Sequence, residues 1–173
     1  MSEGISRRGL LRMLGGGETK QQVPVPDIPA ARPPWARDNR SFLALCDRCN
    51  RCGDVCPERV IRPLDNSDPV LNGIAVLNLD YGECTFCGKC EEVCPTGALD
   101  KELGQQVQAQ VRLTGSCDRL LGMPCDMCEE SCSEQAIMLA VRSAPEISSD
   151  LCTGCGACAL ACYSRALIME KRL

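Results

Sequence analysis

The stretch CTFCGKCEEVCP, at residues 84–95, decides how this chain folds. It spaces four cysteines as C-x2-C-x2-C-x3-C and follows the last one with a proline. Three cysteines two residues apart can wrap a loop around one face of a cube-shaped iron–sulfur cluster, whose four irons each take one thiolate. The fourth cysteine lies on a short helix that leads away and ligates a neighbouring cluster. The stretch therefore predicts half of a two-cluster [4Fe–4S] site.

Three further stretches repeat this pattern, and the four motifs together contain all 16 cysteines of the chain. They are CDRCNRCGDVCP (46–57), CDRLLGMPCDMCEESCS (117–133) and CTGCGACALACY (152–163). The third motif departs from the pattern, because Gly122 stands where its first cysteine is expected and Cys117 lies five residues upstream. We expect the segment DRLLGMP (118–124) to loop out so that Cys117 still reaches its iron. The alternative is a three-iron cluster that leaves Cys117 idle.

The crossover of the fourth cysteine assigns a ligand set to each of four clusters. The first set is Cys46, Cys49, Cys52 and Cys94; the second is Cys84, Cys87, Cys90 and Cys56; the third is Cys117, Cys125, Cys128 and Cys162; the fourth is Cys152, Cys155, Cys158 and Cys132. A pairing of the second motif with the third stays open.

Other uses of these cysteines fit the pattern poorly. Structural zinc sites take two separated C-x2-C pairs, whereas here three cysteines lie within seven residues. Eight disulfides would need an export signal and would leave the regular spacing unexplained. The chain has no histidine, which excludes a His-ligated haem, a c-type haem site and a Rieske centre.

Composition and charge argue against a nucleic-acid-binding protein and against a membrane-spanning one. Aromatic residues make up only 3% of the chain, which is a thin supply for a packed core, so we expect buried clusters to fill the interior. Residues 1–42 carry a net charge of +3 and the remainder −7, for a total of −4. An acidic body does not suit nucleic acid and instead suits a basic patch on a redox partner. No stretch approaches the roughly 18 apolar residues of a membrane span.

These features predict an α+β fold made of two tandem bacterial-type 2[4Fe–4S] modules, with short hairpins, short helices and little regular core. The modules are expected at residues 43–103 and 104–173, after a flexible, basic, proline-rich tail at 1–42. Trp35 is expected to anchor that tail on the body, with a contact to a partner as the alternative. Strand-like pieces lie at 60–64, 73–83, 136–141, 146–151 and 166–170, and 104–115 reads as a polar bridge.

The segment SRRGLLRMLGGGETK (6–20) begins like a twin-arginine export signal. Such a signal also needs an apolar stretch of about 7–15 residues. Here Arg12 interrupts the leucines, and three glycines, Glu18 and Lys20 follow. We therefore expect the chain to stay in the cytoplasm.

The four motifs, SRRGLL, RPPW (32–35) and the seven-residue gap after Cys117 together resemble the NapF-type ferredoxins encoded with the periplasmic nitrate reductase. Tyr163 departs from the proline usual at that place. The resemblance implies a cytoplasmic accessory protein that supplies electrons to the nitrate reductase catalytic subunit before its export. Its partners would be that precursor and a redox donor protein.

The sequence contains no nucleophile with a base, no phosphate loop and no flavin or nicotinamide fingerprint, so we expect an electron carrier rather than an enzyme. Two other functions stay open. The chain could be a chaperone-like binder of the reductase whose clusters are structural. It could also be an exported electron-transfer subunit between quinol oxidation and a periplasmic reductase.

Overall fold

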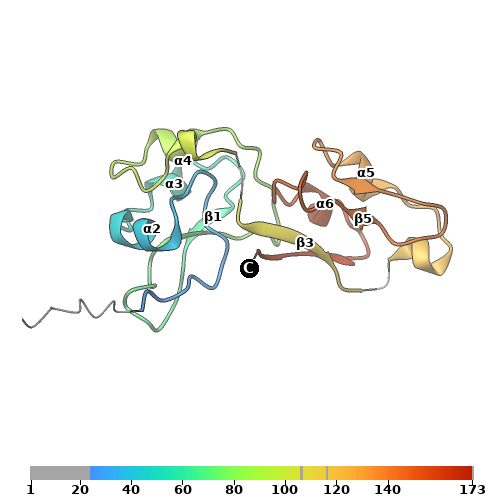
Figure 1. The fold of residues 1–173 in the computed structure, drawn as a ribbon, viewed down its shortest axis with the longest axis horizontal. Coiled ribbons are helices and arrows are strands. Elements are labelled where there is room, and N and C mark those ends of the chain that lie inside the picture. The colour runs from blue at the N-terminus through green and yellow to red at the C-terminus, as the bar shows by residue number, and fades with distance from the viewer. Residues whose placement is uncertain (1–23, 106, 116, 173) are drawn as a thin grey trace, which may run out of the picture.

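The structure is a computed structural model, and it describes residues 24–105, 107–115 and 117–172. The chain forms an N-terminal and a C-terminal half that lie side by side along the long axis (Figure 1). Strand β3 (Ala109–Leu113) runs from the first half into the second. The last strand returns toward the first half, so the C-terminus lies near the middle of the molecule (Figure 1).

Each cysteine motif forms a one-turn helix that contains its third cysteine. These helices are α3 (Arg51–Asp54), α4 (Lys89–Glu92), α5 (Met127–Glu130) and α6 (Ala157–Leu160). The fourth cysteine of each motif follows two residues after the helix ends. Helix α3 packs against α4, and α5 packs against α6. The four motifs are therefore arranged as two pairs of equivalent helices.

A short hairpin connects the two motifs within each half. In the first half, β1 (Ile61–Pro63) pairs antiparallel with β2 (Ala75–Leu77), and in the second half β4 (Ile137–Met138) pairs with β5 (Glu146–Ile147). All three residues of β2 are buried, as is the first residue of β1. The four strands expected around these turns are confirmed, although each is shorter than the segment predicted.

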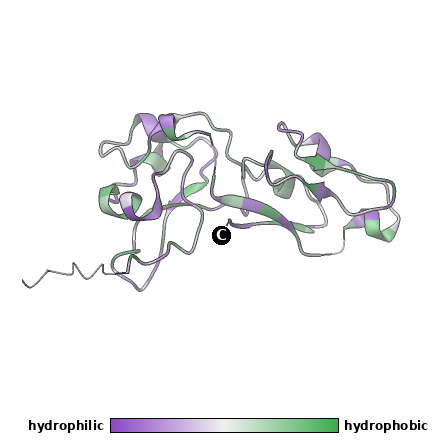
Figure 2. Cartoon of the chain, in the orientation of Figure 1, coloured by the Kyte–Doolittle hydropathy of each residue, from purple (hydrophilic) through white to green (hydrophobic). Residues whose placement is uncertain are grey.

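The polar bridge expected at 104–115 contains a strand at residues 109–113 that the sequence did not predict. These residues form β3, which pairs antiparallel with β6 (Leu167–Lys171) from Ala109↔Lys171 to Leu113↔Leu167. The segment alternates apolar and polar residues, as Figure 2 shows for β3, and Ala109 and Val111 are buried. Its polar residues became strand residues because β6 supplies partners, such as the Glu170 carboxylate that accepts from the Gln110 amide at 3.1 Å.

The first half repeats this topology with a shorter closing pair. The chain before the first motif meets the chain after the second at the bridge Ala36↔Leu99. Around the bridge, the Arg37 amide donates to the Ala98 carbonyl at 3.1 Å, and the Asp100 amide donates to the Trp35 carbonyl at 2.8 Å. Both halves thus have the organisation predicted for a two-cluster module, and the predicted α+β class is confirmed.

Residues 24–42 differ from the expected flexible tail, because they pack into the first half. Ile28, Pro33 and Pro34 are fully buried, and Trp35 is 7% exposed and meets the Phe86 ring edge-on at 6.2 Å. Prolines restrict the unfolded chain, so ordering this segment costs less conformational entropy than ordering an ordinary loop. Trp35 therefore anchors the segment on the body. Residues 1–23, with the paired arginines, lie outside the described residues.

Helix α2 (Asn39–Leu45) ends this segment and leads into the first motif. The Asp38 side chain caps it by accepting from the amides of Arg40 and Ser41, and Phe42 is buried at 1% exposure. The sequence did not predict this helix. It crosses the expected boundary at residue 43, so no break separates the segment from the first module.

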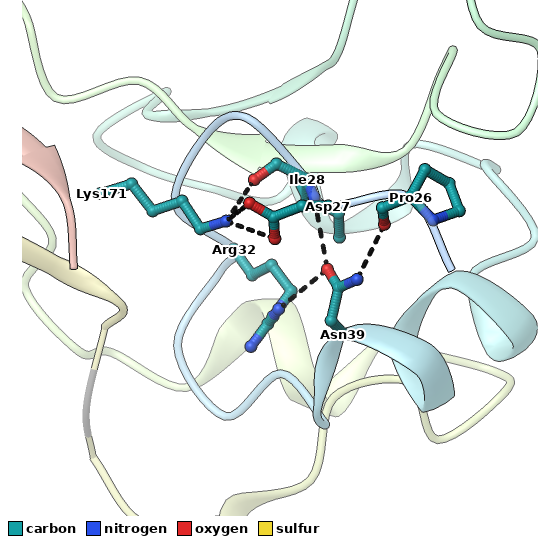
Figure 3. Close-up of polar contacts among 6 residues, drawn as sticks. All are labelled: Pro26, Asp27, Ile28, Arg32, Asn39 and Lys171. Carbon is teal, nitrogen blue, oxygen red and sulfur yellow. Dashed lines mark hydrogen bonds and ion pairs between the residues drawn. The ribbon is translucent and has the colours of Figure 1, made fainter. Parts of the chain in front are cut away.

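Polar contacts tie the N-terminal segment to both the helix and the end of the chain (Figure 3). The Asn39 amide donates to the Pro26 carbonyl at 2.9 Å, and its oxygen accepts from Arg32 Nη1 at 3.3 Å. Lys171, on β6, donates to the Asp27 carboxylate at 2.6 Å and to the Ile28 carbonyl at 2.7 Å. The segment thus joins the two halves.

The apolar core divides into two clusters. The larger one contains Ile28, Phe42 and Ile74 and extends to Val107 and Ala109, and several cysteines pack against it. The smaller one has five buried members, which are Val111, Cys128, Ile137, Cys158 and Leu167. Cysteines therefore take part directly in both cores. Within the described part of the chain, no helix combines the length and apolar character needed to cross a membrane.

Candidate iron–sulfur centres

Four cysteines line a cavity beside helix α2. They are Cys46, Cys49, Cys52 and Cys94. Phe42, Ala75, Ala98 and Leu99 complete the apolar part of the wall. The first three cysteines come from the first motif, whereas Cys94 comes from the end of the second.

A second cavity in the same half has the reciprocal composition. Its cysteines are Cys84, Cys87 and Cys90 of the second motif and Cys56 of the first. Trp35, Phe86, Val60 and Ile61 line the same cavity. The Trp35 ring, which anchors the N-terminal segment, is therefore also part of the wall of this cavity.

A third cavity lies in the C-terminal half. Its cysteines are Cys152, Cys155 and Cys158 of the fourth motif and Cys132 of the third. Val111, Ile137, Ile147 and Met169 surround them, so both strand pairs of this half contribute to the wall. The one-turn helices explain the crossing, because each helix holds its third cysteine on one cavity and directs the chain so that the fourth lies on the next.

The remaining four cysteines share fewer contacts with one another. Cys128, in α5, is close to Cys125 and Cys117: its pKa is raised by burial and, more weakly, by the charges of these two thiolates. Cys117 is also buried. Cys162 follows α6 and packs against the small apolar cluster that contains Cys128. The structure thus brings Cys117 to Cys125 and Cys128 of its motif.

Groups of four cysteines suit a cubane cluster, whose four irons each take one thiolate. In the described ranges of the chain, no group of three Cys, Asp or Glu side chains surrounds one point as a single metal ion requires. The cysteines instead stand around the walls of apolar cavities, as the four corners of a cubane require.

Comparisons with known proteins agree with this chemistry. Residues 45–98 match the 4Fe-4S dicluster domain family, and residues 145–168 match the 4Fe-4S binding domain family. The ferredoxin-type protein NapF of Escherichia coli K12 is 30% identical over 143 residues, which are 80% of this chain and 84% of that protein. The chain belongs to the NapF family of ferredoxin-type proteins.

Two other ferredoxin-type proteins are similar to this NapF family member. The methylamine utilization protein MauM of Methylorubrum extorquens is 29% identical, with 94% of this chain and 82% of MauM covered. NapG of Escherichia coli K12 is 30% identical, with 76% of this chain and 65% of NapG covered. The chain is thus a ferredoxin-type iron–sulfur electron-transfer protein related to NapF.

Left-handed backbone positions shape three motifs of this NapF relative. They flank the second cysteine, with φ of 62° at Arg48, 51° at Phe86 and 77° at Gly154 before it, and 60° at Asn50, 83° at Gly88 and 92° at Gly156 after it. Left-handed residues within a turn let successive backbone N–H groups face one anionic centre. In the third motif the residue after the second cysteine, Asp126, has φ of −132° instead. Its backbone therefore follows a different path.

These left-handed positions were not predicted above, although the residues that favour them stand in the sequence. Asn and Gly are the residues that adopt left-handed conformations most readily, and one of them follows the second cysteine in each regular motif. The third motif has Asp126 there, and Gly122 (φ 83°) provides its left-handed turn within the insertion.

Burial makes several thiols poor acids. Burial raises the pKa of Cys52 and Cys84 to about 11, and that of Cys90 and Cys158 to about 12. Neighbouring thiolates raise these pKa values further, and for Cys90 they include Cys84 and Cys52. These thiols would therefore lose their protons readily only beside a positive charge, which the irons of a bound cluster would supply.

The second and third cavities approach each other where the two halves meet. The Cys84 amide donates to the Cys155 carbonyl at 2.8 Å, and the Val107 amide donates to the Thr153 carbonyl at 3.0 Å. Cys155 is also close enough for its charge to add to the rise in the pKa of Cys84 that burial causes. The cysteine-lined cavities of the two halves are thus neighbours.

Proposed function

We propose that this chain binds four [4Fe–4S] clusters and carries electrons. The observation that supports this most directly is that three cavities are each lined by four cysteines, three from one motif and one from its partner. Bound clusters of this kind accept and release single electrons. The proposed ligand sets are Cys46, Cys49, Cys52 and Cys94; Cys84, Cys87, Cys90 and Cys56; Cys117, Cys125, Cys128 and Cys162; and Cys152, Cys155, Cys158 and Cys132.

The third ligand set rests on the repeated topology. Helices α5 and α6 pack as α3 and α4 do, and Cys162 follows α6 at the same distance along the chain as Cys94 follows α4. Cys94 lies in the cavity of the preceding motif, so Cys162 is assigned to Cys117, Cys125 and Cys128 by equivalence.

The module boundaries follow from the same pairs of motifs. We assign residues 43–103 to the first module and 104–173 to the second. Residues 24–42 accompany the first module, since Trp35 lines its second cavity and Phe42 its first.

We further propose that the electrons serve maturation of the catalytic subunit of the periplasmic nitrate reductase, in the cytoplasm before its export. This role is supported by the similarity to NapF over most of both chains. The partners would be the precursor of that subunit, through a basic surface that suits the acidic body of this chain, and a protein that donates electrons. The chain itself would not be an enzyme.

Iron analysis of the anaerobically purified chain tests the cluster number. Four cubanes give about 16 irons per chain, and three cubanes with one three-iron cluster give about 15. Reduction by dithionite, followed optically and by electron paramagnetic resonance, tests whether the clusters accept electrons. Clusters that stay oxidised under strong reductant would favour the chaperone-like alternative.

Capture from the native host tests the cellular role. We expect a tagged chain to fractionate with the cytoplasm and to retain the precursor of the nitrate reductase catalytic subunit. Recovery mainly from the periplasm would favour the exported electron-transfer subunit. A variant that lacks a cluster ligand, binds the precursor and still matures the enzyme would show that binding, rather than electron transfer, is the function.

A further inference from the structure

Two arginines stand in the same sequence context in the two halves. Cys46-Asp47-Arg48 begins the first motif and Cys117-Asp118-Arg119 begins the third, and no other cysteine of the chain is followed by Asp-Arg. The shared tripeptide marks Cys117 as the equivalent of Cys46. It also raises the question of what the arginines do.

Both guanidinium groups bind backbone carbonyls of the hairpin in their own half. Arg48 donates to Val70 at 2.8 Å and to Asn72 at 3.0 Å, in the turn between β1 and β2. Arg119 donates to Ala140 and, at 3.2 Å, to Ser143, in the turn between β4 and β5. Each arginine therefore fastens the start of a motif to the hairpin that follows it.

The two arginines differ in the acceptor of their third hydrogen bond. Arg48 Nη1 donates to the carbonyl of Cys46, only two residues away, at 3.2 Å. Arg119 Nη1 donates to the carbonyl of Cys125, the second cysteine of its motif, at 2.8 Å. This hydrogen bond spans most of the seven-residue segment that separates Cys117 from Cys125. Arg119 therefore closes a loop that has only two residues in the other three motifs.

Among the residues that the structure describes, the other backbone hydrogen bonds of the insertion belong to its own turns. The Leu120 amide donates to the Cys117 carbonyl at 2.9 Å, and the Met123 amide donates to the Asp118 carbonyl at 3.0 Å. The exposed side chains of Leu120 and Leu121 contribute little packing. A longer flexible loop has more conformations to lose on closure, and a hydrogen bond across its base helps to keep its ends together.

We propose that Arg119 is the positioning residue that keeps Cys117 beside Cys125 and Cys128, and thereby determines whether the third site retains its fourth iron. This inference rests on the proposed assignment of Cys117 as a cluster ligand. Arg48 makes equivalent contacts with its own hairpin, but the chain already holds Cys46 and Cys49 close together with only two residues between them.

The test compares Arg119→Met with the matched control Arg48→Met in the full-length, cluster-loaded protein. Both substitutions keep an apolar stem and remove the donors. Ferricyanide is added in controlled amounts. It accepts the one electron released when a [4Fe–4S]²⁺ cluster loses one iron as Fe²⁺ and becomes [3Fe–4S]⁺. The product has a paramagnetic resonance signal that the starting cluster lacks, so the readout is spectroscopic and stoichiometric.

We expect Arg119→Met to form this signal at least about tenfold faster than the parent, the effect of losing hydrogen bonds from a charged group. Iron should fall from about 16 to about 15 per chain, while Arg48→Met behaves like the parent. Arg119→Lys, which keeps one donor, should be intermediate. An Arg119→Met rate equal to the parent's, or an equal acceleration in Arg48→Met, would overturn the proposal. Loss of a whole cluster in Arg119→Met would also overturn it, because it would show a general role in folding.

Cys117→Ala separates this proposal from the assignment on which it rests. If that variant keeps all its irons and forms no three-iron cluster, Cys117 is not a ligand and the assignment fails. If it loses one iron whereas Arg119→Met does not, the assignment stands and only the role of Arg119 is refuted.

Discussion

Replacement of Gly154 by alanine should loosen the contact between the two halves. Gly154 has φ of 77°, and a Cβ built on it would lie 2.5 Å from the Ala109 carbonyl oxygen and 3.0 Å from that of Val107. Both neighbours are backbone atoms of the chain leading into β3, so neither can rotate away. Arg48 and Phe86 occupy the equivalent position with side chains, so the motif itself tolerates a Cβ there.

The expected destabilisation by Gly154→Ala has two parts. A left-handed alanine costs roughly 1–2 kcal/mol relative to glycine, and forcing an atom into a packed site typically costs about 1–3 kcal/mol. Gly97→Ala is the matched control, since Gly97 has φ of 67° and nothing lies within 4 Å of its Cβ position. Gly97→Ala should show only the cost of a left-handed alanine. The difference between the variants is then about 1–3 kcal/mol, or roughly 5–150-fold in a rate or an equilibrium constant.

The assay follows the loss of visible cluster absorbance in guanidinium under anaerobic conditions. A rate is the appropriate quantity, because release of clusters makes unfolding irreversible. We expect Gly154→Ala to lose its clusters faster than Gly97→Ala by a factor in this range. Equal rates would refute the argument that the Gly154–Ala109 contact, rather than backbone conformation alone, requires glycine.

Three other predictions follow from single contacts. Asp38→Ala removes the N-cap of α2 and should destabilise the first half by about 1 kcal/mol, measured as faster loss of cluster absorbance in guanidinium than in the parent. Trp35→Ala should cost about 3–5 kcal/mol and accelerate iron loss under chelator, whereas Trp35→Phe should cost clearly less. Iron loss in Trp35→Ala as slow as in the parent would contradict a role for Trp35 in closing the second cavity. Hydrogen bonds from Arg112 and Gln110 lower the pKa of Glu170, so its stabilising contribution is present at neutral pH and is lost as the pH falls through that lowered value. The stability difference between the parent and Glu170→Gln should therefore shrink toward acid pH, and a constant difference would contradict this reasoning.

Local spacing explains why much of the architecture could be read from the chain. Thiolates two and three residues apart restrict the backbone to a loop followed by a helical turn, and four such turns are α3, α4, α5 and α6. The hairpins were also predictable, because apolar runs such as residues 74–77 stand between turn-forming residues. These features depend on neighbours in the sequence.

Contacts between distant residues could not be read in this way. The polar segment around Gln110 and Arg112 became a strand because β6, about 60 residues later, supplies Glu170. The segment around Ile28 and Trp35 reads as a linker by its prolines, yet it is buried because the first half leaves apolar surface for it to cover. In both cases the deciding partner lies far along the chain.

The sequence by itself therefore determined the chemistry of this protein, since the type and spacing of its cysteines specify an iron–sulfur cluster whatever surrounds them. Only the tertiary structure decided which motifs pair and how the sites are joined. It brings Cys94 and Cys132 into cavities formed mainly by another motif, places Trp35 in a cavity wall, and sets Cys84 against Cys155. The physical reason is that cysteine spacing is set by covalent geometry over a few residues, whereas these contacts depend on which surfaces remain to be buried once the local turns have formed.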